Sequence, residues 1–387
     1  MIEDAPPRIR DGAAPAAWAF AGARALLFVV SVIGSGLIDM PAGQPVGVPG
    51  WAARVPDTGL DAVFTATERQ DALWYLRIAT TGYAPDDGSA AFFPLYPAVV
   101  RVIAWGPGIG PLGAGLLVAN AAGFGALLML HALTRLEFGG DREIARRTVL
   151  LAALFPTGFF LLSPYTESLF LLLSVSAFWF ARRERWGWAA AAGAGAALTR
   201  SIGVVVAVGL LVEAIRQWRA LGRAPLPRLA GAIGAGLAPL LYAGYWLIRF
   251  DDAWAPLHAQ ANWSRETWLP PVSVWRAIED AWRFGTWWLV DLAVVAVAIV
   301  GLVLVARRVA ASYSVMAWAS LLVPLTMPFP DRPMLSIPRF TVVVFPVFWG
   351  LALLGGRRRG AETALVAGSA AATAVLATMF VNWQPVF

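Results

Sequence analysis

Long apolar segments follow one another through most of this sequence, and only short polar stretches separate them. A helix of about 20 apolar residues is long enough to cross a lipid bilayer. Of the 387 residues, 59% are hydrophobic and 14% are charged, whereas ordinary soluble domains carry roughly 25% charged residues. The pattern therefore predicts an all-α polytopic membrane protein.

We predict about eleven transmembrane helices. They cover residues 18–37, 111–133, 148–163, 165–181, 186–198, 202–215, 229–248, 289–306, 313–327, 341–355 and 362–380. Clusters of arginine precede the first span and follow the second, fourth, sixth, eighth and tenth. Since basic residues favour the cytoplasmic side, residues 1–17 are expected to be a cytoplasmic tail, followed by a single transmembrane domain at 18–387.

This threading leaves three long loops on the outer side, at 38–110, 249–288 and 328–339. Residues 92–105 are too short to cross and contain Arg101, so they are predicted to be interfacial. The net charge of +6 fits the cytoplasmic arginines better than it fits nucleic-acid binding.

Several kinds of site are absent from the sequence. It has no cysteine and only two histidines, which argues against thiolate chemistry and against a zinc site. It also has no glycine-rich nucleotide-binding motif. We therefore do not expect ATP or a nucleotide sugar as a substrate.

Asp71 is the first candidate catalytic residue. If residues 70–80 form a helix, Trp74, Tyr75 and Ile78 lie on the face of Asp71. Aromatic rings that exclude water strengthen a carboxylate as a base. The alternative is an acidic residue that only stabilises the start of a helix.

Three further charged residues lie near the outer ends of apolar segments. Glu167 follows Ser163 and Pro164, which suit the start of a helix, and an ionisable residue there is costly unless it has a function. Arg200 and Arg339 are not explained by the preference of basic residues for the cytoplasm, and a guanidinium can bind phosphate through two hydrogen bonds. Helix stabilisation and snorkelling to the interface are the structural alternatives.

The aromatic segment around Pro94, Tyr96 and Pro97 is predicted to form a short interfacial helix or hairpin. Such a segment suits a groove for a lipid tail, and it equally suits ordinary packing.

Five sequence blocks together resemble the PIG-V-like mannosyltransferases. In order along residues 68–345 they are DALWYLRIATTGY, FFPLYP, FPTGFFLLSPYTESLF, LTRSIG and IPRF. The first and third blocks are the more specific ones. The chain departs from the family at Gln70, where an aromatic residue is common, and at the RSIG sequence, which puts acceptor preference in doubt.

The resemblance implies a GT-C glycosyltransferase, a bundle of transmembrane helices with interfacial helices in the first outer loop. It implies Asp71 as the catalytic base, Glu167 as a second acid, and Arg200 and Arg339 as ligands of a lipid phosphate. The same blocks hold our other candidates for substrate binding, which are Arg77, Tyr75, Trp74, Tyr96 and Tyr165.

The implied activity is transfer of mannose, with inversion, from a polyprenyl-phosphate donor to a lipid or glycan acceptor. We expect it on the extracytoplasmic side of a bacterial plasma membrane. The sequence requires no cofactor, although Mg²⁺ or Mn²⁺ could bridge a carboxylate to the phosphate. The alternatives are another polyprenyl-phosphate sugar, a transporter or lipid flippase, and a non-catalytic membrane scaffold.

Overall fold

Helices make up nearly all of the regular structure in the computed structural model, which describes residues 8–41, 47–54, 60–222, 226–261, 265–384 and 386. The first half contains α1 (Ala13–Val29), α2 (Ala62–Thr65), α3 (Asp71–Thr81), α4 (Leu95–Ala104), α5 (Pro111–Glu137), α6 (Arg142–Ala153), α7 (Glu167–Arg182), α8 (Trp186–Thr199) and α9 (Val204–Leu221). The second half contains α10 (Leu226–Leu237), α11 (Pro239–Phe250), α12 (Ala255–Ala261), α13 (Pro270–Phe284), α14 (Thr286–Val305), α15 (Ala311–Leu322), α16 (Ile337–Thr341), α17 (Pro346–Gly355) and α18 (Ala361–Val381).

Two short strands form the described β structure. β1 (Gly47–Val48) and β2 (Trp51–Ala52) pair antiparallel as a hairpin within the first long loop. The prediction of an all-α protein is therefore confirmed apart from this hairpin.

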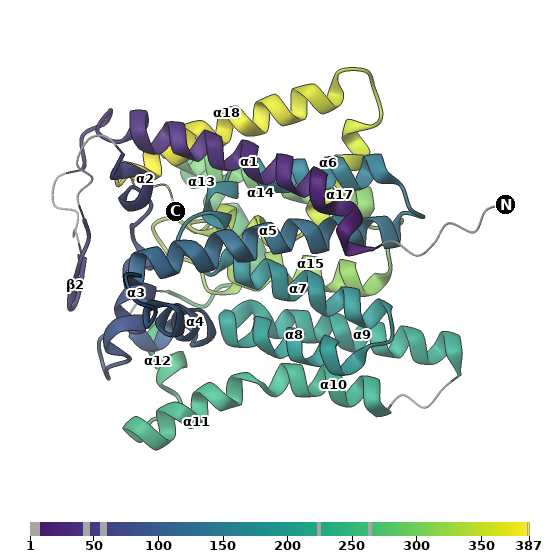
Figure 1. The fold of residues 1–387 in the computed structure, drawn as a ribbon, viewed down its shortest axis with the longest axis horizontal. Helices are drawn as coiled ribbons and strands as arrows, with labels where there is room; N and C mark the ends of the chain where they lie inside the picture. The colour runs from purple at the N-terminus through teal and green to yellow at the C-terminus, as the bar shows by residue number, and fades with distance from the viewer. Residues whose placement is uncertain are drawn as a thin grey trace.

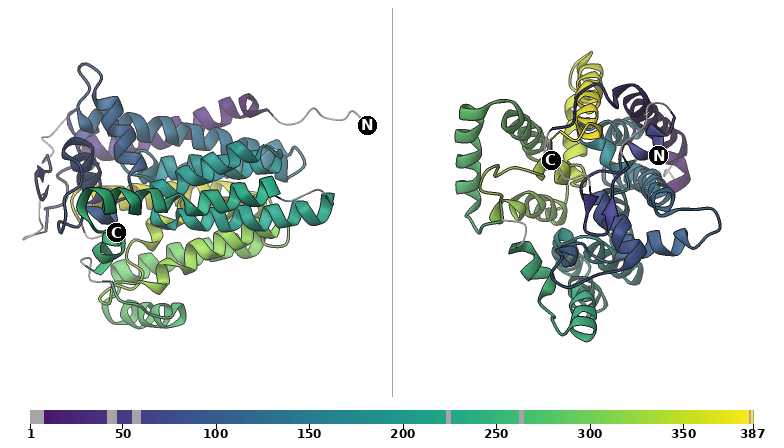
Figure 2. Two further views of the ribbon diagram at one scale, coloured as in Figure 1. Left: turned by 90° about the horizontal axis from the view of Figure 1, so that it is seen from below. Right: turned by 90° about the vertical axis from the view of Figure 1, so that its left-hand side faces the viewer.

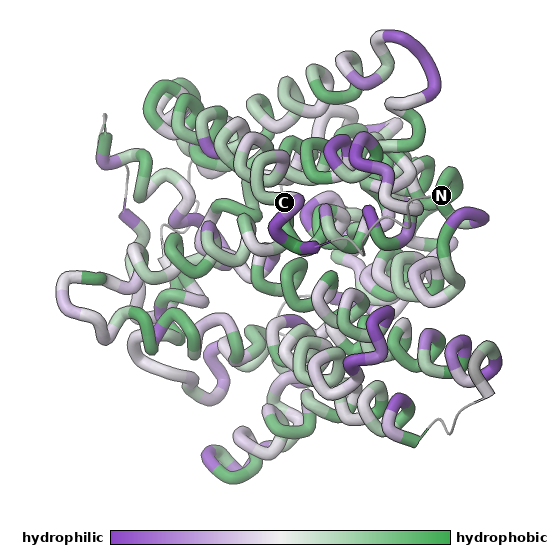
Figure 3. Tube along the Cα trace, turned by 45° about the vertical axis from the view of Figure 1, so that its right-hand side comes forward, coloured by the Kyte–Doolittle hydropathy of each residue, from purple (hydrophilic) through white to green (hydrophobic). Residues whose placement is uncertain are grey.

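The longer helices run roughly along one axis, so the molecule has two distinct ends (Figures 1 and 2). α2, α3, α4 and α12 gather with the β hairpin at the left-hand end of Figure 1. The C-terminal ends of α7 and α9, with their arginines, point toward the other end. The most hydrophilic stretches lie mainly in the turns between helices (Figure 3).

Five helices in the described ranges are long and apolar enough to cross a membrane. They are Ile9–Gly34, Pro111–Glu137, Ser201–Ala220, Thr286–Val305 and Ala361–Val381. α10 and α11 together make a sixth candidate, bent by 40° at their junction. The protein is thus an integral membrane protein with five or six candidate spans, and the predicted number of about eleven is not reached.

The region 148–181 differs from the prediction. We expected a span at 148–163, but α6 ends at Ala153 and is followed by a turn and a short 3-10 helix, Gly158–Leu161. Pro156 cannot continue a helix in the ordinary way, because it lacks an N–H and clashes with the preceding turn. Glu167 is the first residue of α7 with Thr166 as its N-cap, so the prediction of a helix start at Ser163 and Pro164 was wrong.

Other expected elements agree with the structure. α3 agrees with the helix assumed at 70–80, and α4 is the short helix expected within 92–105. The main apolar core joins residues of α1, α5, α7, α15 and α17, among other helices. A smaller aromatic cluster around Tyr242 and Trp246 fastens α11 to the first loop.

α14 and α17 approach each other closely at two glycines, Gly301 and Gly350. A Cβ atom added at Gly350 would overlap the backbone carbonyl of Gly301. Small residues at such a crossing allow helix backbones in a membrane to pack closely. The contact matters for function, because α17 follows directly on the segment that carries α16 and Arg339.

We predict that Gly350→Ala lowers the melting temperature of the detergent-purified protein. The added methyl group would collide with backbone atoms of Gly301, which cannot rotate away as a side chain can, so the two helices must separate. Overpacking of this kind lowers the free energy of unfolding by about 1–3 kcal/mol. Gly244→Ala in α11 is the control, because a Cβ there has nothing within 4 Å and alanine favours a helix over glycine. An equal melting temperature for wild type and Gly350→Ala would contradict the close crossing.

Candidate active site

The start of α3 places Asp71 at the surface of a cavity. Arg69, two residues before Asp71, is fully buried, and its guanidinium donates to the carbonyls of Thr65, Glu68 and Val381. The hydroxyl of Tyr165 donates to the carbonyl of Arg69 at 2.7 Å. These bonds fix the backbone on the N-terminal side of Asp71. Burial lowers the pKa of Arg69 to about 10, so this anchor is still a cation at neutral pH.

Beneath Asp71, the carboxylate of Glu167 is fully buried. Its Oε1 atom lies 2.5 Å from Nη1 of Arg200 and 3.0 Å from Nε of Arg339. Nη1 of Arg200 also donates to the hydroxyl of Thr166 at 3.0 Å. An isolated carboxylate in this position would be strongly destabilising, so the two guanidinium groups compensate for its burial.

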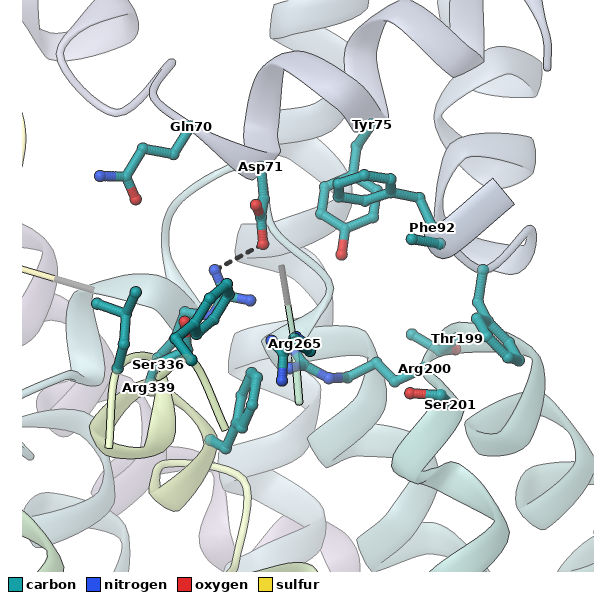
Figure 4. Close-up of a pocket in the computed structure, with 15 residues that line it drawn as sticks. Gln70, Asp71, Tyr75, Phe92, Thr199, Arg200, Ser201, Arg265, Ser336 and Arg339 are labelled. Carbon is teal, nitrogen blue, oxygen red and sulfur yellow. Dashed lines mark ion pairs between the residues drawn. The ribbon is translucent and has the colours of Figure 1, made fainter. Parts of the chain in front are cut away.

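Arg339 bridges the buried carboxylate of Glu167 and the partly exposed carboxylate of Asp71. Its Nη1 atom lies 2.7 Å from Oδ2 of Asp71, as the dashed line in Figure 4 shows. Burial alone would lower the pKa of Arg339, but the carboxylates of Asp71 and Glu167 outweigh this and hold that pKa above its usual range. Asp71 keeps 24% of its side chain exposed, and its Oδ1 has no hydrogen bond from any residue in the described ranges.

These side chains border a cavity of about 380 Å³, which lies within the range of about 300–1,000 Å³ common for ligand sites. Its walls come from the start of α3, the segment before α4, the turn after α8, the loop before α13 and the region 328–340. The lining residues are Gln70, Asp71, Tyr75, Ala91, Phe92, Phe93, Thr199, Arg200, Ser201, Arg265, Phe329, Leu335, Ser336, Arg339 and Phe340.

The loop that carries Ser336 and Arg339 is itself held by a buried ion pair. Nε and Nη2 of Arg332 lie 2.7 Å and 2.8 Å from the two carboxylate oxygens of Asp291 in α14. Nη2 also donates to the carbonyl of Val386 at 3.0 Å. This two-point contact holds the loop against α14, and so supports the position of Arg339.

Of the predicted site residues, four line the cavity, namely Asp71, Tyr75, Arg200 and Arg339. Glu167 lies directly behind them through its contacts with both arginines. The hydroxyl of Tyr75 is 3.4 Å from that of Thr166, the residue before Glu167.

The other four candidates support the wall instead of lining it. Arg77 forms an ion pair with Asp87, Trp74 stacks on Phe92, and the hydroxyl of Tyr96 donates to the carbonyl of Gly115. Tyr165 holds the backbone of Arg69, as described above. Direct substrate binding by these four side chains stays a prediction.

Arg265 is a cavity residue that the sequence analysis missed. It comes from the loop before α13, donates from Nη1 to the carbonyl of Met327 at 3.0 Å, and lies over the ring of Phe329. Burial lowers the pKa of Arg265, and repulsion from Arg339 lowers it further. A desolvated cation beside a second cation is stabilised by an anionic ligand. The only signal in the sequence was a basic residue within the second outer loop.

No group of three or more histidine, aspartate or glutamate side chains in the described part of the chain is arranged to hold a metal ion. The carboxylates of Asp71 and Glu167 face arginines instead.

We predict that Glu167→Gln destabilises the protein, because it leaves Arg200 and Arg339 without their shared counter-charge. Removing one partner of a buried ion pair costs about 3–5 kcal/mol, which thermal unfolding in detergent would detect. Glu266→Gln is the matched control, since that side chain is exposed and bonds Trp268. Equal melting temperatures for both variants would show that the buried pairs contribute little.

Comparison with known proteins identifies a family over part of the chain. Residues 53–219 match the family model described as mannosyltransferase (PIG-V). This segment includes Asp71, Glu167 and Arg200, and ends before Arg265 and Arg339. No curated protein sequence matches the chain.

Solved structures similar to this chain include three of the oligosaccharyltransferase of the archaeon Archaeoglobus fulgidus. The complex with Zn and sulfate has 12% identity and a TM-score of 0.46 over 95% of this chain and 53% of that one. The form tethered with an acceptor peptide has 11% identity and a TM-score of 0.46 over 96% and 55%. AglB with an inhibitory peptide and a dolichol-phosphate has 12% identity and a TM-score of 0.47 over 95% and 56%. The chain thus spans about half the length of these proteins.

Proposed function

We propose, from the premise that this chain belongs to the PIG-V family of membrane mannosyltransferases, that it transfers mannose from a polyprenyl-phosphate donor with Asp71 as the catalytic base. The single observation that carries the proposal is the position of Asp71. Its carboxylate faces a cavity that also exposes Arg200 and Arg265, while Arg339 holds one of its oxygens.

The charges around the cavity favour a donor with one negative charge. Among the described residues that line or underlie it, three guanidinium groups (Arg200, Arg265 and Arg339) face two carboxylates (Asp71 and Glu167), which leaves one positive charge. A polyprenyl-phosphate sugar is a phosphodiester with a single negative charge. The donor phosphate therefore completes the charge balance of the site.

The reaction follows from the free oxygen of Asp71. An acceptor hydroxyl donates a hydrogen bond to Oδ1, and its oxygen attacks the anomeric carbon of mannose while its proton passes to the carboxylate. The bond from that carbon to the phosphate oxygen breaks, and the electron pair leaves with the lipid phosphate, next to Arg200 and Arg265. A single displacement inverts the anomeric centre, so a β-linked donor gives an α-linked product.

We place this reaction on the extracytoplasmic side. The cavity lies at the end of the molecule that carries α3 and α4, away from the C-terminal ends of α7 and α9 with their arginines (Figure 1). Since arginine clusters favour the cytoplasm, the cavity end is the one that faces outward.

We predict that Asp71→Asn reduces mannose transfer by roughly 10²–10⁴-fold, the contribution typical of a general base. Purified protein would be incubated with radiolabelled polyprenyl-phosphate mannose and a lipid extract of host membranes. Asp86→Asn in the same loop is the control, because Asp86 is exposed and lies outside this cavity. Wild-type rates in Asp71→Asn would refute the assignment of the base.

Arg265 gives a second test, which addresses the donor phosphate. We predict that Arg265→Gln raises the KM for the donor by roughly 10- to 100-fold, because a hydrogen bond to a charged group is worth about 1.5–3 kcal/mol. Arg276→Gln on α13 is the matched control, since this exposed arginine pairs only weakly with Glu279 at 3.4 Å. An unchanged donor KM would place the phosphate elsewhere.

A further inference from the structure

Two residues of the cavity wall have a backbone conformation that usually belongs to glycine. Gln70 has φ 49° and ψ −119°, and Ser336 has φ 68° and ψ −13°. Positive φ is costly for a residue with a Cβ atom and is concentrated at functional sites. Gln70 directly precedes Asp71, and Ser336 caps the helix that carries Arg339, so both positions flank the ion pair at the reaction centre.

Both side chains are uncharged, polar and available to a ligand. They line the cavity, both are partly exposed, and within the described ranges no protein group forms a hydrogen bond with the amide of Gln70 or the hydroxyl of Ser336. An amide offers two donors and an acceptor, and a hydroxyl offers one donor and two acceptor positions. Neutral groups of this kind suit the hydroxyls of a sugar ring.

In the view of Figure 4, their position separates them from Arg200, one of the two cations that face the donor phosphate. In Figure 4, Gln70 and Ser336 lie to the left of Asp71, whereas Arg200, Thr199 and Ser201 lie to the right. In an inverting displacement the attacking oxygen and the leaving group occupy opposite faces of the reacting sugar. With the phosphate at Arg200, the acceptor enters past Asp71 from the side of Gln70 and Ser336.

We propose that Gln70 and Ser336 form an acceptor subsite that binds a neutral, hydroxyl-rich acceptor, namely a sugar ring. The proposal rests on the function proposed above, and it adds two residues that position the acceptor. A glycine at either position would relax the backbone, and the proposal assigns a contact with a ligand to the side chain that stands there instead.

The experiment compares sugar acceptors with water. Wild type, Gln70→Gly, Gln70→Ala and Ser336→Gly are assayed with polyprenyl-phosphate mannose and the octyl glycosides of mannose, glucose and glucosamine as acceptors. Hydrolysis of the donor is measured without acceptor, because water needs no subsite. Asp86→Gly is the matched control, since Asp86 also has positive φ (59°) but lies outside this cavity.

We expect wild type to use at least one octyl glycoside. Each of the three cavity variants should raise the KM for that acceptor by roughly 3- to 10-fold, the loss expected for a hydrogen bond to an uncharged group. Donor hydrolysis and donor KM should not change. Gln70→Gly and Asp86→Gly should melt no lower than wild type, because glycine tolerates positive φ.

Three outcomes would overturn the subsite. In the first, wild type consumes the donor but transfers mannose to none of the glycosides. In the second, the cavity variants keep the wild-type acceptor KM, and in the third they lose sugar transfer and donor hydrolysis to the same extent. A wild-type protein that does not consume the donor at all would instead refute the function proposed above, and the subsite with it.

Discussion

The buried carboxylate of Glu167 is the contact on which the rest of the site depends. It forms ion pairs with both Arg200 and Arg339, which come from segments far apart in the sequence, and so fixes the turn after α8 against α16. Arg339 then reaches Asp71 at the start of α3. Because a buried charge is tolerated only with good partners, these three segments must meet in one arrangement for the fold to be stable.

The same ion pairs that stabilise the fold also position the proposed catalytic carboxylate. Arg339 pairs with Glu167 and with one oxygen of Asp71, which leaves the other oxygen for the acceptor hydroxyl in the reaction that we propose. The arginines exceed the carboxylates by one charge, and the phosphate of a lipid-linked sugar would balance it. Supporting contacts at Arg69 and Arg332 hold the two backbone segments that present this pair. Rigid support of this kind lowers the cost of reorganisation during the reaction.

Much of the fold class was predictable, because apolar length and low charge leave few alternatives to a helical membrane protein. The helix assumed over residues 70–80 is present as α3, which begins at Asp71. The segment 148–163 was not, since its apolar composition suggests a span while Pro156 ends the helix early. Arg265 was missed because a loop has no periodicity that distinguishes a residue facing a cavity from one facing solvent. Arg77 is the opposite case. Its sequence block suggested substrate binding, but the structure pairs it with Asp87, a contact that the sequence alone does not reveal.

The most direct test of the central claim is a structure of the complex determined by electron cryo-microscopy. The ligand is a polyprenyl-phosphate 2-deoxy-2-fluoromannose, which reacts slowly because fluorine destabilises a positive charge at the neighbouring anomeric carbon. We predict that its phosphate lies within hydrogen-bond distance of Arg200 and Arg265, with Oδ1 of Asp71 facing the anomeric carbon from the opposite side. A phosphate bound outside this cavity, or a sugar ring remote from Asp71, would contradict the account.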